Sequence, residues 1–159
     1  MRRCLLIAFA MILSLGSTLQ AQNIIIGDKA PDLRIKQWLM DMQPEAAAYT
    51  CVLFYHSESP LCRKHISSVK SIAKEVDGEL NIVILTKEKY GKAGVTLTEH
   101  LDDHIGVAFD DEGRTFRSYG VRFIPFCVIY DAKRKVVWCG HAGSLNEKTI
   151  ERVMNIKKQ

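Results

Sequence analysis

The sequence predicts a single α/β domain with a central mixed β-sheet and helices on both faces, and three observations lead to this fold class. The chain has 159 residues, of which 47% are hydrophobic and 25% charged, the size and composition of one globular domain. Residues 50–55 and 80–85 are almost continuous apolar runs, typical of strands buried on both faces of a parallel sheet. Helical patterns lie between and after these runs, and a predicted hairpin near the C-terminus makes the sheet mixed.

The best-defined local element is a strand, loop and helix in the first half of the chain. The strand at residues 50–55 leads through a short polar loop into a helix over residues 61–76, along which apolar side chains recur at helical spacing. Ser59 is a good N-cap for this helix. Pro60 suits its first position, because a residue there needs no N–H donor.

The other elements are shorter and follow from alternation, turn residues and helical spacing. In chain order they are a turn at 27–32, a strand at 33–35, the strand at 80–85, a helix at 97–104, an extended piece at 107–110, a helical turn at 115–119, strands at 126–130 and 136–139, and a helix at 145–156. Residues 131–135 connect the last two strands as a hairpin.

Residues 1–21 have the pattern of an export signal and not of the fold. Two arginines form a charged start, residues 5–15 are almost unbroken apolar sequence, and the small residues before position 22 suit a cleavage site. The apolar run is shorter than the ~20 residues of a membrane span. We therefore expect a periplasmic or secreted bacterial protein whose mature domain is residues 22–159, with an uncleaved N-terminal anchor as the alternative.

Charge excludes one class of partner. The formal net charge is +4, and removal of residues 1–21 takes away two arginines and no acids, which leaves +2. No run of Lys and Arg interleaved with aromatic residues accompanies this small charge, so we predict no nucleic-acid partner. We also predict no membrane contact beyond the signal segment, and the sequence leaves the oligomeric state open.

Four cysteines, Cys51, Cys62, Cys127 and Cys139, remain after the predicted signal. In an oxidising compartment an even number permits disulfides, with three full connectivities. No two of them have Cys-x-x-Cys or zinc-ribbon spacing. We therefore predict no metal site and no cofactor.

Four segments, taken in order, resemble the periplasmic thioredoxin-like proteins of the TlpA/ResA type, within the redoxin superfamily. They are Gly-Asp-Lys-Ala-Pro-Asp-Leu at 27–33, the loop region at 54–64, Tyr-Gly-Val-Arg-Phe-Ile-Pro at 119–125, and Val-Trp-Cys-Gly-His at 137–141. The resemblance covers about residues 27–153. It implies a thioredoxin-like fold and, as the usual activity, reduction or exchange of disulfides in exported proteins.

The resemblance also assigns site residues. The Cys-x-x-Cys of the family falls on Ser59-Pro60-Leu61-Cys62, so the attacking cysteine is replaced by Ser59 and only Cys62 of the pair is retained. Attack on a disulfide requires a thiolate, which a serine cannot supply. Pro125 matches the cis-proline of the family, and the turn formed by Ile124 and Pro125 is expected to bind an extended substrate peptide.

The reactivity of Cys62 stays open from sequence. The positive end of the helix dipole and nearby basic residues such as Arg63 and His65 would favour a reactive thiolate. The resolving cysteine of such turns is also commonly shielded, which would make Cys62 a buried small residue.

These residues predict an exported redox protein of the thiol-disulfide oxidoreductase type that is a monothiol or weakly active member. Its partner would be an exported polypeptide or a thiol or disulfide substrate. One alternative is a non-catalytic module that binds polypeptide beside Pro125. The other is a peroxiredoxin-like thiol peroxidase, because Ser59 and Cys62 match the end of the peroxiredoxin pattern Pro-x-x-x-Thr/Ser-x-x-Cys. Two elements of that family are absent: Tyr55 stands at the position of the proline, and the arginine that polarises the peroxide would fall near Pro125.

A disulfide between Cys127 and Cys139 depends on the register of the predicted hairpin. If Asp131 pairs with Lys135, the two cysteines lie opposite each other with side chains on one face. A shift of one residue places them on opposite faces and forbids the bond. We expect two independent thiols.

Overall fold

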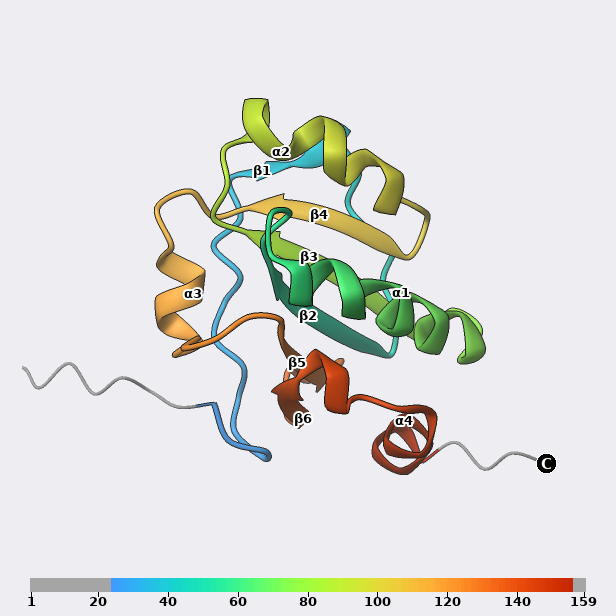
Figure 1. The fold of residues 1–159 in the computed structure, drawn as a ribbon. Coiled ribbons are helices and arrows are strands. Elements are labelled where there is room, and N and C mark those ends of the chain that lie inside the picture. The colour runs from blue at the N-terminus through green and yellow to red at the C-terminus, as the bar shows by residue number, and fades with distance from the viewer. Residues whose placement is uncertain (1–23, 156–159) are drawn as a thin grey trace, which may run out of the picture.

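A six-stranded mixed sheet with strand order β1-β4-β3-β2-β5-β6 forms the centre of the computed structural model, which describes residues 24–155 (Figure 1). The strands are β1 Gln37–Trp38, β2 Tyr49–Tyr55, β3 Leu80–Thr86, β4 Ile105–Phe109, β5 Phe126–Asp131 and β6 Val136–His141. β2, β3 and β4 are parallel, whereas β1, β5 and β6 each join the sheet antiparallel to a neighbour. The predicted mixed sheet is confirmed. The predicted signal at residues 1–21 lies outside the described residues.

Helices cover both faces of this sheet. They are α1 Pro60–Glu75, α2 Tyr90–Leu97, α3 Arg114–Ser118 and α4 Glu147–Met154, with short 3-10 helices η1 Leu39–Asp41, η2 Thr98–His100 and η3 Ala142–Ser144. One apolar cluster joins a face of the sheet to α1, α2 and α4, and a second joins the opposite face to α3 and the N-terminal segment 24–38. The predicted α/β fold with helices on both faces is therefore confirmed.

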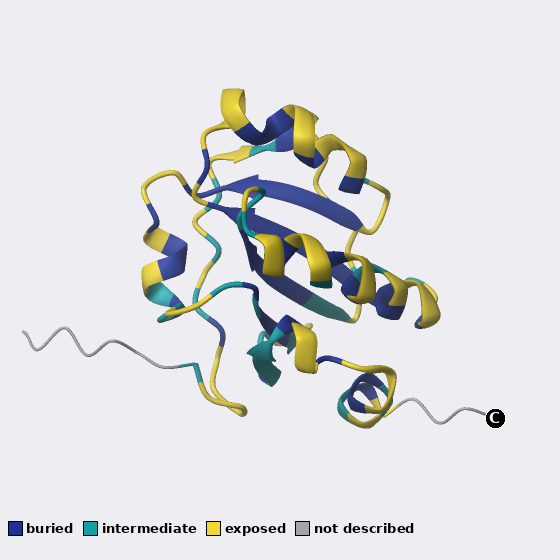
Figure 2. Ribbon diagram, viewed as in Figure 1, coloured by how far each residue is buried: buried dark blue, intermediate teal, exposed yellow. Residues whose placement is uncertain are grey.

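The two central strands are buried as their composition predicted. All seven residues of β3 and the last five of β2 are buried. Figure 2 shows this burial on the central strands, while the outward faces of α1 and α2 are exposed. Both sheet faces are covered by helices or chain, so neither strand alternates between apolar and polar residues.

The region after β3 differs from the predicted helix at 97–104. Helix α2 begins at Tyr90, and only η2 continues it to His100. Two glycines in residues 90–96 argued against a helix there. Gly94 is buried where α2 approaches Leu39, and a Cβ at this position would lie 3.3 Å from the Leu39 Cδ1 atom. Close packing of the helix against η1 thus outweighs the low helical propensity of glycine.

The predicted strand at 33–35 is also displaced, since the first strand of the sheet is β1 at Gln37–Trp38. This strand is only two residues long and pairs with β4. Leu33 and Ile35 instead pack as partly buried side chains on the cluster beneath α3. Their alternating pattern reflects this packing and not a place in the sheet.

A bulge separates Cys127 from Cys139. The turn pairs as expected, because the Asp131 N–H donates to the Lys135 carbonyl at 3.0 Å. The register then shifts at Ile129/Tyr130, so that Cys127 lies opposite Gly140 and Cys139 opposite Val128. Cys127 lies in the cluster beneath α1, and Cys139 packs on the opposite cluster. The two thiols are independent, as expected.

This register predicts the result of a simple chemical test. Mass spectrometry of unreduced protein, denatured in the presence of an alkylating reagent, should find Cys127 and Cys139 on separate alkylated peptides. Their side chains lie on opposite sheet faces, and a disulfide needs Cβ atoms ~3.5–4.5 Å apart. A peptide that links the two cysteines would show that the bulge is misplaced.

Candidate functional site

The candidate site lies where β2 ends and α1 begins. The loop after Tyr55 turns at Ser57, and Ser59 is the N-cap of α1, followed by Pro60 at the first position. The Ser59 Oγ atom accepts a hydrogen bond from the Cys62 N–H at 3.3 Å. Ser59 therefore acts as a helix cap in this structure, a role that stabilises helices by about 1 kcal/mol.

Cys62 lies on the inner side of α1. Its relative exposure is 0%, and it belongs to the cluster beneath this helix together with Cys51 and Cys127. A thiol in this position cannot be reached by a polypeptide disulfide unless the turn moves. Of the two possibilities left open by the sequence, the geometry of the resting protein agrees with a shielded Cys62.

The other two cysteines of this cluster are paired with each other by a hydrogen bond and not by a disulfide. The hydrogen bond to Cys51, burial, and the nearby thiols of Cys51 and Cys62 raise the pKa of Cys127 well above its usual value. Cys127 is therefore protonated at neutral pH and is a poor nucleophile.

Pro125 and Ile124 lie beside residues 56–62, the loop and helix start that are called the turn from here on. Phe54 of β2 pairs with Phe126 of β5, so the end of β2 and the residue before β5 lie at the same edge of the sheet. The Ile124–Pro125 peptide bond is cis. Ile124 is half-buried and contacts the same cluster as Cys62, whereas the Pro125 carbonyl accepts from the Ala142 N–H at 3.0 Å. The Pro125 carbonyl is thus already paired inside the protein.

Two large apolar side chains near this edge are exposed. Leu61, in the first turn of α1, has a relative exposure of 51%, and Phe123, two residues before Pro125, has 50%. The Phe123 ring stacks on His141 with centroids 6.0 Å apart and meets the edge of Phe126 at 5.3 Å. These contacts hold Phe123 in place at the surface, where it can pack against a ligand.

A buried carboxylate that the sequence did not indicate supports the loop. Glu88 follows β3 and has a relative exposure of 6%. It accepts hydrogen bonds from the Ser57 N–H at 2.8 Å, the Ser57 hydroxyl at 2.6 Å and the Thr86 hydroxyl at 2.9 Å. Burial alone would raise the pKa of Glu88, but these hydrogen bonds and the nearby His56 hold it below its ordinary value. Glu88 is therefore ionised at neutral pH and fixes the loop.

The carboxylate within the loop itself, Glu58, has a different environment. It is exposed and pairs with Lys92 at 3.0 Å. The signal for Glu88 was its position after the carboxyl end of a buried parallel strand, an edge where functional groups of α/β sheets collect. The sequence could not show that Ser57 would fold onto it.

The peroxidase alternative finds little support in the geometry. Peroxiredoxin-like chemistry needs an arginine beside the thiol, and the arginine nearest in sequence to Pro125 is Arg122. Arg122 lines a small cavity with Tyr119, Phe123 and other residues that do not include Cys62. Within residues 24–155, no three His, Cys, Asp or Glu side chains gather closely enough to hold a metal ion. In the same part of the chain, no helix has the length and apolar character needed to cross a membrane.

Comparison with known proteins finds similarity in structure but not in sequence. No protein-family model and no curated protein sequence matches the chain. A candidate thiol:disulfide interchange protein DsbE from Chlorobium tepidum is similar with a TM-score of 0.64 and 23% identity, over 83% of this chain and 99% of that one. StoA from Bacillus subtilis gives a TM-score of 0.53 and 16% identity, over 70% and 85%.

A third solved structure adds a surface protein to this set. The exposed lipoprotein thioredoxin Etrx1 from Streptococcus pneumoniae strain TIGR4 has a TM-score of 0.56 and 19% identity, over 74% of this chain and 90% of that one. At identities of this size the likeness concerns the fold. The chain has a thioredoxin-like fold of the kind found in thiol-disulfide oxidoreductases.

Proposed function

We propose that this protein is an exported, TlpA/ResA-like member of the thiol-disulfide oxidoreductase type that retains one thiol at its turn and is at most weakly active. The observation that supports this most directly is that a serine, Ser59, stands three residues before Cys62 at the N-terminus of α1. Ser59 occupies the position of an attacking cysteine and caps α1, while Cys62 is 0% exposed. The predicted export signal at residues 1–21 supports a periplasmic or secreted location.

The chemistry left to Cys62 is a single exchange step. Its thiolate would attack one sulfur of a substrate disulfide, form a mixed disulfide, and release the other sulfur as a thiolate. A dithiol turn would then release the substrate by attack of its second thiol. Cys127, with its raised pKa, is a poor source of that thiolate. The mixed disulfide would therefore persist until a small external thiol attacks it.

A second candidate function is binding of extended polypeptide without catalysis. The exposed Leu61 and Phe123 favour it, because both lie at the sheet edge where Ile124 and Pro125 precede β5. Apolar side chains held at the surface are typical of interaction sites. A shielded Cys62 would not impair such binding.

Measurements on the wild-type protein and on a Cys62→Ser variant distinguish these functions. We expect insulin reduction near background and slow alkylation of Cys62 in the native protein at pH 7, with fast alkylation after denaturation, because burial limits access to the thiol. Trapping of a mixed disulfide by Cys62 with a small aromatic disulfide would support the monothiol protein. Binding of a reduced, unfolded polypeptide that survives Cys62→Ser without any trapped adduct would support the non-catalytic module.

Sustained turnover would contradict the proposal if it survives the combined replacement of Cys51, Cys127 and Cys139 by alanine. Loss of such turnover on replacement of one of them would instead identify that cysteine as a resolving thiol.

A further inference from the structure

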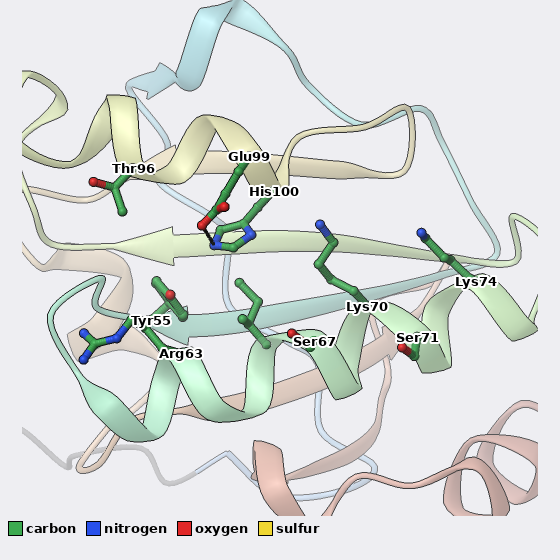
Figure 3. Close-up of a pocket in the computed structure, with 10 residues that line it drawn as sticks. Tyr55, Arg63, Ser67, Lys70, Ser71, Lys74, Thr96, Glu99 and His100 are labelled. Atoms are coloured by element: carbon green, nitrogen blue, oxygen red, sulfur yellow. Dashed lines mark ion pairs between the residues drawn. The ribbon is translucent and has the colours of Figure 1, made fainter.

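A cavity of about 430 Å³ lies between α1 and the segment that contains α2 and η2. Figure 3 shows side chains of both segments around it, with Lys70 extending from α1 toward His100 and Lys74 projecting from a later turn of the same helix. Arg63 lies at the N-terminal end of the same helix. The cavity begins at the candidate site, since Arg63 follows Cys62 and donates a hydrogen bond to the Ser57 carbonyl at 2.8 Å.

The lining of this cavity is positively charged. Arg63, Lys70 and Lys74 contribute three cations, and Glu99 contributes the single carboxylate. Among residues 24–155, no ion pair joins Lys70 or Lys74 to a carboxylate. Their charges are therefore available to a ligand.

The opposite wall of the cavity adds no positive charge at neutral pH. His100 is buried, and burial together with the positive charge of Lys70 lowers its pKa, against the opposing effect of Glu99 at 3.7 Å. With His100 neutral, the charged side chains that line the cavity are three cations and one anion. Hydroxyl groups of Ser67 and Ser71 on α1 and of Thr96 on α2 add neutral hydrogen-bond donors to the lining.

The three cations are spread along the helix and not gathered at one point. Arg63 and Lys74 are eleven residues apart on α1, which corresponds to about 16 Å along the helix axis. A single phosphate or carboxylate cannot bridge this distance. An extended polypeptide rises ~3.3 Å per residue, so about five of its residues cover the same length.

We propose that this cavity binds an acidic segment of an extended polypeptide whose neighbouring residues dock at the turn beside Pro125. The inference rests on the proposed function and specifies its substrate class: polypeptides with several Asp or Glu residues next to the docked segment. Continuity from the turn through Arg63 to Lys74 favours a peptide over a separate small anion. Opposite charge supplies the selectivity of the binding.

Fluorescence anisotropy with two labelled peptides tests this. Both peptides carry the same apolar half without cysteine, and the other half contains either four glutamates or four glutamines. We expect the acidic peptide to bind the wild-type protein about tenfold more tightly at low salt, with the preference shrinking as salt rises. The double variant Lys70→Gln/Lys74→Gln should lose most of the preference, and Glu99→Gln should increase it.

Lys64→Gln is the control for the loss of one positive charge from α1, and it is compared with Lys70→Gln and Lys74→Gln as single variants. Lys64 is an exposed lysine of the same helix that does not line the cavity, so this variant should keep the preference. Circular dichroism melts of each variant check that the fold is retained. Equal loss of preference in the control would overturn the inference, because the general charge of α1 would then explain it.

The remaining outcomes separate this inference from polypeptide binding at the turn, while the redox part of the proposed function is tested by the trapping of a mixed disulfide at Cys62. If both peptides bind equally, the acidic cavity site is wrong while polypeptide binding at the turn stands. If neither peptide binds, both are wrong. If inorganic polyphosphate binds more tightly than the acidic peptide, and does so through Lys70 and Lys74, the ligand is a non-peptide polyanion and the inference is overturned.

Discussion

The substitution Ser59→Cys is expected to convert this protein into a working dithiol reductase. The N-cap side chain already lies over the first turn of α1, with its Oγ atom 3.3 Å from the Cys62 N–H. A thiol at this helix N-terminus would be stabilised as a thiolate, as in Cys-x-x-Cys turns where the pKa falls from ~8.5 to about 7. The thiolate fraction at pH 7 would rise more than tenfold over that of an ordinary cysteine.

The measurement has a chemical and a catalytic part. After mild oxidation, mass spectrometry should find the introduced thiol bonded to Cys62, and the reduced variant should reduce insulin above the wild-type rate. The double variant Ser59→Cys/Cys62→Ser is the matched control, because it keeps the new nucleophile but cannot resolve a mixed disulfide. It should trap substrate and turn over poorly.

A failure of the introduced thiol to bond with Cys62 would mean that the turn is wrongly placed. Ser59→Ala measures the loss of the cap alone, which we expect to cost about 1 kcal/mol of folding free energy. A comparable loss in the Ser59→Cys variant would reflect the weaker acceptor strength of sulfur and would not argue against the redox result.

The parts of the fold that the sequence predicted are those determined by local pattern. The continuous apolar runs identified β2 and β3, and Ser59 with Pro60 identified the beginning of α1. Each of these signals lies within a few neighbouring residues. Composition and spacing were therefore sufficient for them.

The features that the sequence missed or left open depend on distant partners. The bulge between β5 and β6 arises from pairing across the hairpin, and the start of α2 depends on the contact between Gly94 and Leu39. The burial of Cys62 also depends on β2 and β5, which close the cluster beneath α1. No local pattern distinguishes a shielded cysteine from a reactive one at the same helix position.

Glu88 is the clearest case, and its replacement by glutamine is expected to destabilise the fold and to loosen the turn. The carboxylate accepts two hydrogen bonds from Ser57, which lies 31 residues earlier in the chain, and one from Thr86. In the glutamine variant an NH2 group, itself a hydrogen-bond donor, replaces one carboxylate oxygen and faces a group that also donates. Hydrogen bonds to charged groups contribute ~1.5–3 kcal/mol each, so we expect Glu88→Gln to lower the free energy of unfolding at pH 7 by about 2 kcal/mol.

The pH dependence follows from the direction of the pKa shift. The pKa of Glu88 is lower in the folded protein than in the unfolded chain, so its contribution to stability is complete above the unfolded value of ~4.3. The contribution is lost as the pH falls through the lower folded value. Urea unfolding at pH 7 and at successively lower pH should therefore show a smaller acid loss for Glu88→Gln than for the wild type.

Glu58→Gln is the control, since this exposed carboxylate pairs only at the surface and should change stability by no more than ~0.5 kcal/mol. The effect on the candidate site is a separate readout. Because Glu88 holds Ser57 next to the turn, its loss should open residues 56–59 more often and speed alkylation of Cys62 in the native protein. Wild-type stability and wild-type labelling in Glu88→Gln would show that the loop does not depend on this carboxylate, and that the shielding of Cys62 comes from α1 and the strands beneath it.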